Sequence, residues 1–312
     1  MEQMTGRPSE FSSELFEKAV KNPEDLNKVV RPSLTYWQSA WIKLKKNKVA
    51  MIGLIILIVY ILLAIFAPIL SEYDYFTQNP KLLNKGPSAE HWFGTDQAGR
   101  DLWVRNWSGA RISLFIGIAV VSINTLNGCI IGGISGYFGG KADMVIMRII
   151  DVLYGIPTTI LAILLRTVIT SSGIAPLVFA MVAIGWIGTA RFVRGQVLQM
   201  KNQEYVMAAR MLGASDARII FRHMIPNISG LLITNMTMAI PQAIFTEAFL
   251  SFIGLGVQAP KCSWGSLAKV AIATFKIYPY QLLIPSFFIC TATLAFNMLG
   301  DGLRDALDSR IR

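Results

Sequence analysis

The sequence predicts an all-α, polytopic membrane protein with six transmembrane helices. Of its 312 residues, 53% are hydrophobic and only 15% are charged, whereas soluble domains carry about 25% charged residues. Several uncharged stretches are long enough to cross the hydrocarbon core of a bilayer, and the mean hydropathy is +0.49. The basic residues are scattered between the apolar runs, which indicates membrane anchoring rather than nucleic-acid binding.

The polar N-terminal segment, residues 1–48, is expected to be a cytoplasmic tail. It does not read as a signal peptide, because no apolar core follows a short basic start. Trp37 and Trp41 precede a run of lysines, a pattern typical of anchoring at the cytoplasmic membrane surface. The first predicted span, residues 49–70, contains no charge, and at ~1.5 Å per residue it crosses the bilayer.

Residues 71–111 are expected to form an external segment. Its centre holds two glycines that predict turns and three charged residues that can form a local salt-bridge cluster. We favour a structural role for this cluster over contact with a substrate. The residues of this external signature are Gly94, Thr95, Asp96, Gly99, Arg100 and Asp101.

The second predicted span, residues 112–140, is also free of charge. It ends in three glycines spaced four residues apart, Gly132, Gly136 and Gly140, and such spacing lets helices approach closely within lipid. Residues 139–141 resemble part of a phosphate-binding loop. The rest of that motif does not match, because its first glycine and its Ser/Thr are both replaced. Since no other Walker-type loop occurs, we expect no ATP hydrolysis by this chain.

The third predicted span, residues 149–165, begins near Asp151 and contains Pro157, which predicts a kink. A structural role and a gating role both remain open for these two residues. The fourth span, residues 174–190, ends at Arg191, which returns the chain to the cytoplasmic side.

A polar island follows the fourth span and predicts two short helices joined by a tight turn outside the bilayer. Residues 204–212 are mostly good helix formers, and Gly213 suits the left-handed conformation that ends a helix. Ser215 or Asp216 can cap the second helix, and Pro226 is expected to end it before the next apolar run.

The fifth predicted span, residues 228–248, holds one carboxylate, Glu247. An ionisable group in a membrane segment is a candidate functional residue by default. Because Glu247 lies near the outer end, we favour a helix-packing or gate role over proton transfer. The sixth span, residues 282–300, is followed by a short charged tail.

The distribution of basic residues sets the predicted orientation. Of the 29 lysines and arginines, 20 fall in segments that this topology places in the cytoplasm and nine in external segments. This asymmetry has the sign that the positive-inside rule requires, and it places both termini and the polar island in the cytoplasm. The three scattered cysteines and two histidines predict neither a disulfide framework nor a metal site.

Three stretches, in order along the chain, resemble signatures of the oligopeptide, dipeptide and nickel branch of ABC importer permeases. Residues 91–101, His-Trp-Phe-Gly-Thr-Asp-Gln-Ala-Gly-Arg-Asp, are similar to the family pattern HxFGTDxxGRD. Residues 247–265 are similar to EAxLSFLGLGxxPPxPSWG, with Ala259 and Cys262 in place of two family prolines.

The polar island resembles the coupling or "EAA" loop of the same permeases. Ala208, Ala209, Gly213, Ile225 and Pro226 match the pattern, and the two alanines leave a bare surface that a partner's backbone can approach. The family glutamate is replaced by Met207, and Glu204 lies one turn earlier. The resemblance implies contact with an ATPase subunit for a set of residues in this loop. They are Glu204, Ala208, Ala209, Gly213, Ala214, Ser215, Asp216 and Pro226.

The resemblance extends from about residue 43 to residue 310 and is closest to the C-type subunit of oligopeptide permeases. It implies the type I ABC importer permease fold. The chain would then divide into a tail (1–48), a first helix with the external segment (49–110), a permease domain (111–302) that contains the coupling loop (195–227), and a tail (303–312).

The partners that the resemblance implies are a second homologous permease, two ATPase subunits that bind ATP and Mg, and an extracytoplasmic binding protein. The complex would lie in the cytoplasmic membrane of a prokaryote, and this chain would carry no catalytic residue and bind no cofactor or metal. Oligopeptides are the preferred substrate, with dipeptides, nickel chelates and glutathione as alternatives, because selection lies largely with the binding protein.

Two other function classes fit the sequence less well. A secondary transporter would favour several intramembrane charges or an inverted repeat with broken helices, whereas only Asp151 and Glu247 lie in or beside predicted spans. A membrane enzyme would need a nucleophile–base pair or a metal constellation, and the sequence suggests neither.

Overall fold

The computed structural model describes residues 34–169 and 173–307. The chain divides into two compact units, Met1–Ser39 and Ala40–Arg312. In the first unit the described residues contain only the start of helix α2 (Tyr36–Lys46). The predictions for residues 1–33 and 308–312 lie outside the described residues.

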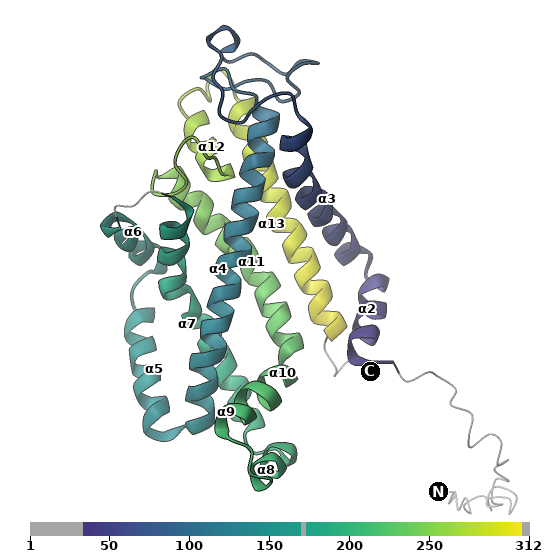
Figure 1. The fold of residues 1–312 in the computed structure, drawn as a ribbon, viewed down its shortest axis with the longest axis vertical. Helices are drawn as coiled ribbons and strands as arrows, with labels where there is room; N and C mark the ends of the chain where they lie inside the picture. The colour runs from purple at the N-terminus through teal and green to yellow at the C-terminus, as the bar shows by residue number, and fades with distance from the viewer. Residues whose placement is uncertain (1–33, 170–172, 308–312) are drawn as a thin grey trace, which may run out of the picture. The chain divides into compact units, whose positions relative to one another are not determined.

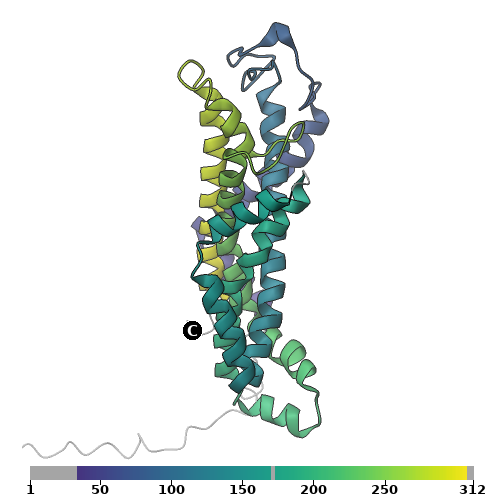
Figure 2. The ribbon, with the colours of Figure 1, turned by 90° about the vertical axis from the view of Figure 1, so that its left-hand side faces the viewer.

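The second unit is a helical bundle (Figures 1 and 2). Four of its described helices are long and apolar enough to cross a membrane, and two bent helix pairs raise the number to six if each pair is one span. This agrees with the six predicted spans and with the predicted all-α fold. The four helices are α3 (Lys48–Leu70), α4 (Leu102–Phe138), α7 (Ile174–Met200) and α13 (Tyr280–Leu307). The bent pairs are α5 (Gly140–Tyr154) with α6 (Thr158–Val168), and Asp216–Asn227 with α11 (Ser229–Phe252).

Helix α4 begins ten residues before the predicted start of the second span. The reason is a cap, because the side chain of Asp101 accepts a hydrogen bond from the N–H of Val104 at 2.9 Å. The resulting 37-residue helix is about 55 Å long. It therefore extends well beyond the ~30 Å hydrocarbon core. Helix α7 likewise continues past its predicted end at residue 190 to Met200.

The close packing of α4 on α7 depends on glycines, but one turn earlier than predicted. A Cβ on Gly132 would lie 2.3 Å from the carbonyl oxygen of Ala190, and one on Gly136 would lie 2.9 Å from that of Arg194. Gly140 faces open space and begins α5, so it takes no part in this contact. The third close approach is made by Gly128, where a Cβ would lie 2.6 Å from the Cβ of Thr189.

The predicted third span is two helices rather than one kinked helix. Helix α5 ends at Tyr154, α6 begins after Pro157, and the two are bent by 85°. The break at Pro157 is as predicted, because the proline cannot continue the hydrogen-bond ladder of α5. Helix α5 starts at Gly140, nine residues before the predicted start of the third span.

Short elements complete the fold: η2 (Pro80–Leu82), α8 (Glu204–Met211), α9 (Asp216–Arg218), the π-helical segment η3 (Ile219–Met224), α10 (Ile225–Asn227) and α12 (Trp264–Ala271). Helix α12 was not predicted. It starts with a capping box in which Ser263 and Ser266 each accept a hydrogen bond from the other's backbone N–H.

The two ends of the bundle carry different kinds of structure. The external segment after α3 lies at one end, and α8 and α9 lie at the opposite end in both views (Figures 1 and 2). Toward the end that carries residues 71–101, an aromatic core packs α3, α4, α12 and α13 together through Tyr60, Trp107, Trp264 and Phe288.

Candidate functional site

We name the segment Glu204–Asn227 the coupling elbow. As predicted, helix α8 ends just before a left-handed glycine, Gly213, with φ of +78°. The N–H of Gly213 donates to the carbonyl of Arg210 at 3.0 Å, and that of Ala214 donates to the carbonyl of Ala209 at 3.1 Å. These bonds close the last turn of α8 and fix the direction in which the chain leaves it.

The second half of the elbow differs from its prediction. Instead of one helix that ends at Pro226, the chain winds through α9, η3 and α10, and Pro226 lies in the first turn of α10. A proline is tolerated there, because the first turn of a helix needs no N–H donor. The chain then bends by 68° into α11. Ser215 is the N-cap of α9, but it contributes its carbonyl oxygen, which accepts from Ile219, rather than its side chain.

A buried tyrosine of α4 ties the elbow to the bundle. The hydroxyl of Tyr137 donates to Oδ1 of Asp216 at 2.7 Å and accepts from Nη2 of Arg210 at 3.1 Å. The guanidinium of Arg210 also lies 5.4 Å from the centre of the Tyr137 ring. Both halves of the elbow are therefore attached to the end of α4. Sequence reasoning missed Tyr137, because its two partners are 73 and 79 residues away.

The elbow has a buried base and an exposed tip. Val206, Ile219 and Met224 pack against Val193 and Val197 of α7 in one apolar cluster. At the tip, Met211 and Leu212 are 90% and 88% exposed. Of the predicted contact residues, Glu204, Ala208, Gly213, Ser215, Asp216 and Pro226 are exposed, and Ala209 and Ala214 are partly buried. Met207, at the position of the family glutamate, is exposed on the same helix.

The external signature is a compact knot of turns and hydrogen bonds. The carboxylate of Asp96 accepts from Nε of Arg100 at 2.8 Å and from the backbone N–H groups of Ala98 and Arg100. Asp101 caps α4 and lies 2.8 Å from Nδ1 of the buried His91. These contacts join residues of the signature to one another and to His91, and the structural role that we favoured stays a prediction.

The two glycines and the threonine of the signature serve the same knot. Gly94 and Gly99 have φ of +75° and +71°, and a Cβ on Gly99 would lie 1.9 Å from the carbonyl oxygen of Asn79. Thr95 is buried; its hydroxyl accepts from the N–H of Lys85 at 2.8 Å and donates to the carbonyl of Leu82.

Glu247 is fully buried where three helices meet. Its carboxylate accepts from the hydroxyls of Ser113 on α4, at 2.8 Å, and of Ser251 on its own helix, at 2.7 Å. The oxygen of Ser113 also accepts from the N–H of Trp264 at 3.2 Å, which brings in α12. The carboxylate therefore joins α4, α11 and α12, and its packing or gate role stays a prediction.

The cysteine that replaces the last proline of the family pattern after Glu247 is buried. Cys262 is 1% exposed, and its Sγ donates to the carbonyl oxygen of Arg105 at 3.3 Å. Burial raises the pKa of this thiol. This hydrogen bond joins the loop before α12 to the N-terminal part of α4.

Asp151 and Pro157 lie near the bend between α5 and α6. Oδ1 of Asp151 accepts from Nη2 of Arg191 on α7 at 2.5 Å, and the same guanidinium lies 4.4 Å from the centre of the Tyr154 ring. The side chain of Asp151 is exposed, and that of Arg191 is partly buried. The predicted site residues thus form separate groups, with the elbow and the external signature at opposite ends of the bundle (Figure 1).

Comparison with known proteins identifies two family models along the chain. Residues 128–312 match the binding-protein-dependent transport system inner membrane component, and residues 35–87 match the N-terminal TM domain of oligopeptide transport permease C. These regions include the coupling elbow and the first long apolar helix.

Similar proteins match over most of their length. The oligopeptide transport system permease protein OppC of Bacillus subtilis is 49% identical over 96% of this chain and 97% of its own. The dipeptide transport system permease protein DppC of the same organism is 49% identical over 94% and 91%. The glutathione transport system permease protein GsiD of Pectobacterium atrosepticum is 40% identical over 89% and 92%. This chain is therefore an integral membrane protein that belongs to the family of binding-protein-dependent transport system inner membrane components.

Proposed function

We propose that this chain is a transmembrane permease subunit of an ATP-driven importer that moves oligopeptides across the cytoplasmic membrane of a prokaryote. The names of its relatives support this class of substrate, since an oligopeptide permease and a dipeptide permease are each 49% identical to it. Dipeptides, glutathione and nickel chelates are the competing cargoes. Both termini lie in the cytoplasm, in line with the distribution of basic residues.

The observation that carries the proposal is the coupling elbow. It offers an exposed apolar tip, while its base is buried against α7 and Tyr137 ties it to α4. A segment that is exposed at one end and firmly attached at the other suits a partner that pushes on it. We assign ATP and Mg to two partner ATPase subunits, one of which holds this elbow, because the chain has no Walker-type loop.

The helices attached to the elbow explain how such a push would reach the membrane region. Helix α7 leads into the elbow, α11 leaves it, and α4 is joined to it through Tyr137. Closure of the ATPase pair on ATP would move the three helices together between an inward-open and an outward-open state. This coupling requires that the two states differ in their contacts with the partner.

The remaining parts of the chain are assigned by the same proposal. Residues 1–48 and 303–312 are cytoplasmic tails, 49–110 are the first helix with the external segment, and 111–302 are the permease domain with the coupling loop 195–227. A second homologous permease completes the membrane region, and an extracytoplasmic binding protein delivers the cargo.

Reconstitution tests this function directly. The chain is expressed with its second permease and two ATPase subunits, purified, and placed in liposomes with the cognate binding protein. Uptake of an oligopeptide is compared with that of a dipeptide, glutathione and a nickel chelate. We expect oligopeptide uptake that requires both ATP and the binding protein. Uptake driven by an ion gradient without ATP, or a complex that lacks ATPase subunits, would contradict the proposal.

A further inference from the structure

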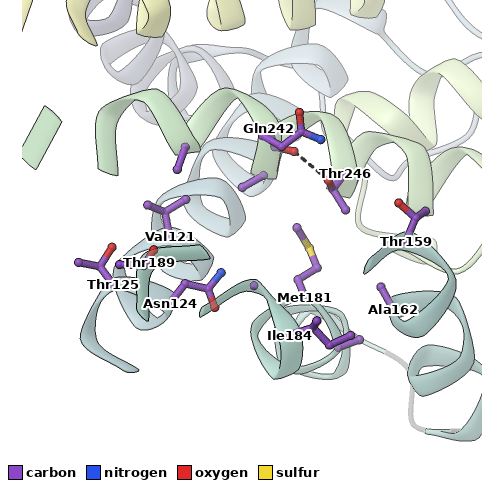
Figure 3. A pocket seen from close by; sticks show the side chains of 14 residues that line it. Val121, Asn124, Thr125, Thr159, Ala162, Met181, Ile184, Thr189, Gln242 and Thr246 are labelled. Atoms are coloured by element: carbon purple, nitrogen blue, oxygen red, sulfur yellow. Dashed lines mark hydrogen bonds between the residues drawn. The ribbon is translucent and has the colours of Figure 1, made fainter. Parts of the chain in front are cut away.

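A cavity of about 220 Å³ lies between α4, α6, α7 and α11 (Figure 3). These helices belong to the apolar bundle that we assign to the membrane. Fourteen described residues line it, and none of them is charged. Six are polar, and they come from all four helices: Asn124, Thr125, Thr159, Thr189, Gln242 and Thr246. Uncharged amides and hydroxyls thus gather in a region where apolar side chains would suffice for packing.

One of these polar groups has no protein partner. Asn124 is 8% exposed, and among the described residues none forms a hydrogen bond with its Oδ1. Its amide points toward the cavity in Figure 3. A buried amide oxygen left without a partner destabilises the folded protein. Such a group is expected to meet water or a ligand in the working protein.

The backbone opposite Asn124 is shaped to leave room for its amide. A Cβ on Gly185 of α7 would lie 2.2 Å from Nδ2 of Asn124. On α11, the hydroxyl of Thr246 donates to the carbonyl of Gln242 at 2.8 Å, and the Gln242 side chain is exposed (Figure 3). Asn124 and Gln242 therefore line the same cavity from different helices.

The chemistry of this lining matches a peptide main chain. Each side-chain amide can donate to a carbonyl oxygen and accept from an N–H, which are the two groups that every peptide unit presents. A lining without charge gives no preference for acidic or basic side chains of the ligand. The lining therefore suits the main chain of a peptide, which is the same whatever the sequence of its side chains.

The walls of the cavity belong to the helices that the coupling elbow would move. Asn124 is on α4, which Tyr137 ties to the elbow, and Gln242 is on α11, which continues directly from it. Thr159 lies in the first turn of α6, next to the 85° bend at Pro157. Movement of α4, α7 and α11 with the elbow would therefore change the distance from their lining groups to Thr159 on α6.

We propose that this cavity binds the main chain of a peptide in transit, with the side-chain amides of Asn124 and Gln242 as its hydrogen-bonding groups. The inference rests on the proposed transport of peptides and adds the place and chemistry of contact. It requires that these amides contact the cargo directly, and that the absence of charge makes the contact indifferent to sequence.

The first test changes the charge of the cavity with little change in shape. Asn124→Asp and Gln242→Glu are compared with Asn127→Asp, the same change three residues along α4 at a residue that does not line the cavity. Three peptides of equal length that contain one lysine, no charge or one glutamate are preloaded on the binding protein, and uptake per loaded protein is measured. Co-purification of the ATPase subunits shows which variants assemble.

We expect the wild-type complex and Asn127→Asp to take up the three peptides at rates within about twofold of one another, because no fixed charge faces the cargo. In Asn124→Asp and Gln242→Glu, the ratio of lysine-peptide to glutamate-peptide uptake should rise about tenfold. An unchanged ratio in assembled variants would overturn the inference. Failure of the wild-type complex to import any peptide would instead overturn the proposed function.

A second variant separates main-chain contact from side-chain contact. Asn124→Leu removes the amide while keeping a similar volume, and we expect uptake of all three peptides to fall by the same factor, about fivefold. A loss confined to one peptide would contradict main-chain binding.

The final test needs no mutation. A peptide that carries a photoreactive diazirine is caught in the wild-type complex during transport and cross-linked. We expect adducts on the lining residues of α4 and α11, and adducts found only elsewhere would overturn the inference even if no variant assembles.

Discussion

Removal of one hydroxyl tests whether the elbow transmits force to the membrane helices. Tyr137→Phe deletes the donor to Asp216 and the acceptor for Arg210 but keeps the ring against the Arg210 guanidinium. A hydrogen bond to a charged group contributes about 1.5–3 kcal/mol. Because Asp216 and Arg210 are both exposed, water replaces part of the loss, and we expect about 1–2 kcal/mol.

A change of 1.4 kcal/mol is about tenfold in an equilibrium, so the elbow of Tyr137→Phe should detach from α4 about ten times more often. The ATPase subunits would still close on ATP, but part of their movement would not reach α4. We therefore expect ATP hydrolysis near the wild-type rate and a clear fall in peptide imported per ATP. The assay is simultaneous measurement of both rates in proteoliposomes.

The matched control is Tyr154→Phe on α5, where the ring face that contacts Arg191 stays in place. A double-mutant cycle with Asp216→Ala, which removes the acceptor Oδ1, isolates the hydrogen bond. If Tyr137 acts through Asp216, the double variant loses little more than either single variant. Losses that simply add, or an unchanged ratio of import to hydrolysis in Tyr137→Phe, would refute the reasoning.

Three further predictions concern single positions. Gly213→Val should abolish uptake while membrane insertion persists, because φ of +78° costs a β-branched residue at least ~1–2 kcal/mol. Gly213→Asn should keep most of the wild-type uptake, because asparagine tolerates this conformation. Equal uptake by both variants would contradict the turn's role. Gly99→Ala should lower the melting temperature of the complex, since its Cβ would meet the carbonyl of Asn79 at 1.9 Å; no change would show that the external knot can relax. The Glu247→Gln variant should import peptide at nearly the wild-type rate. The Glu247→Ala variant should lose about 1–3 kcal/mol of free energy of unfolding. Abolished uptake in the glutamine variant would instead favour proton transfer.

The membrane class and the spans could be predicted because they depend on local composition. An uncharged run such as residues 49–70 carries its own evidence, and α3 occupies Lys48–Leu70. The turn at Gly213 is equally local, since its geometry depends on one residue without a Cβ. Errors appeared where a polar side chain acts at a helix end, as when the cap at Asp101 starts α4 ten residues early.

Features that depend on distant partners could not be read from the sequence. Tyr137 is one of nine tyrosines, and nothing near it in the chain indicates that Asp216 and Arg210 lie beside its hydroxyl. The cavity is similar, because Asn124, Thr159 and Gln242 become neighbours only when four helices pack. The external signature was assigned a structural role from its charges alone, but the contribution of His91 required the fold.

The central claim is that the coupling elbow is held by a separate ATP-hydrolysing subunit. It is tested most directly by a photoreactive amino acid placed at Leu212, which is 88% exposed at the tip of the elbow, in the complex within native membranes. We predict one cross-linked product, formed with an ATPase subunit and altered in yield by ATP. A product formed only with an extracytoplasmic protein, or no product while transport remains active, would contradict the account.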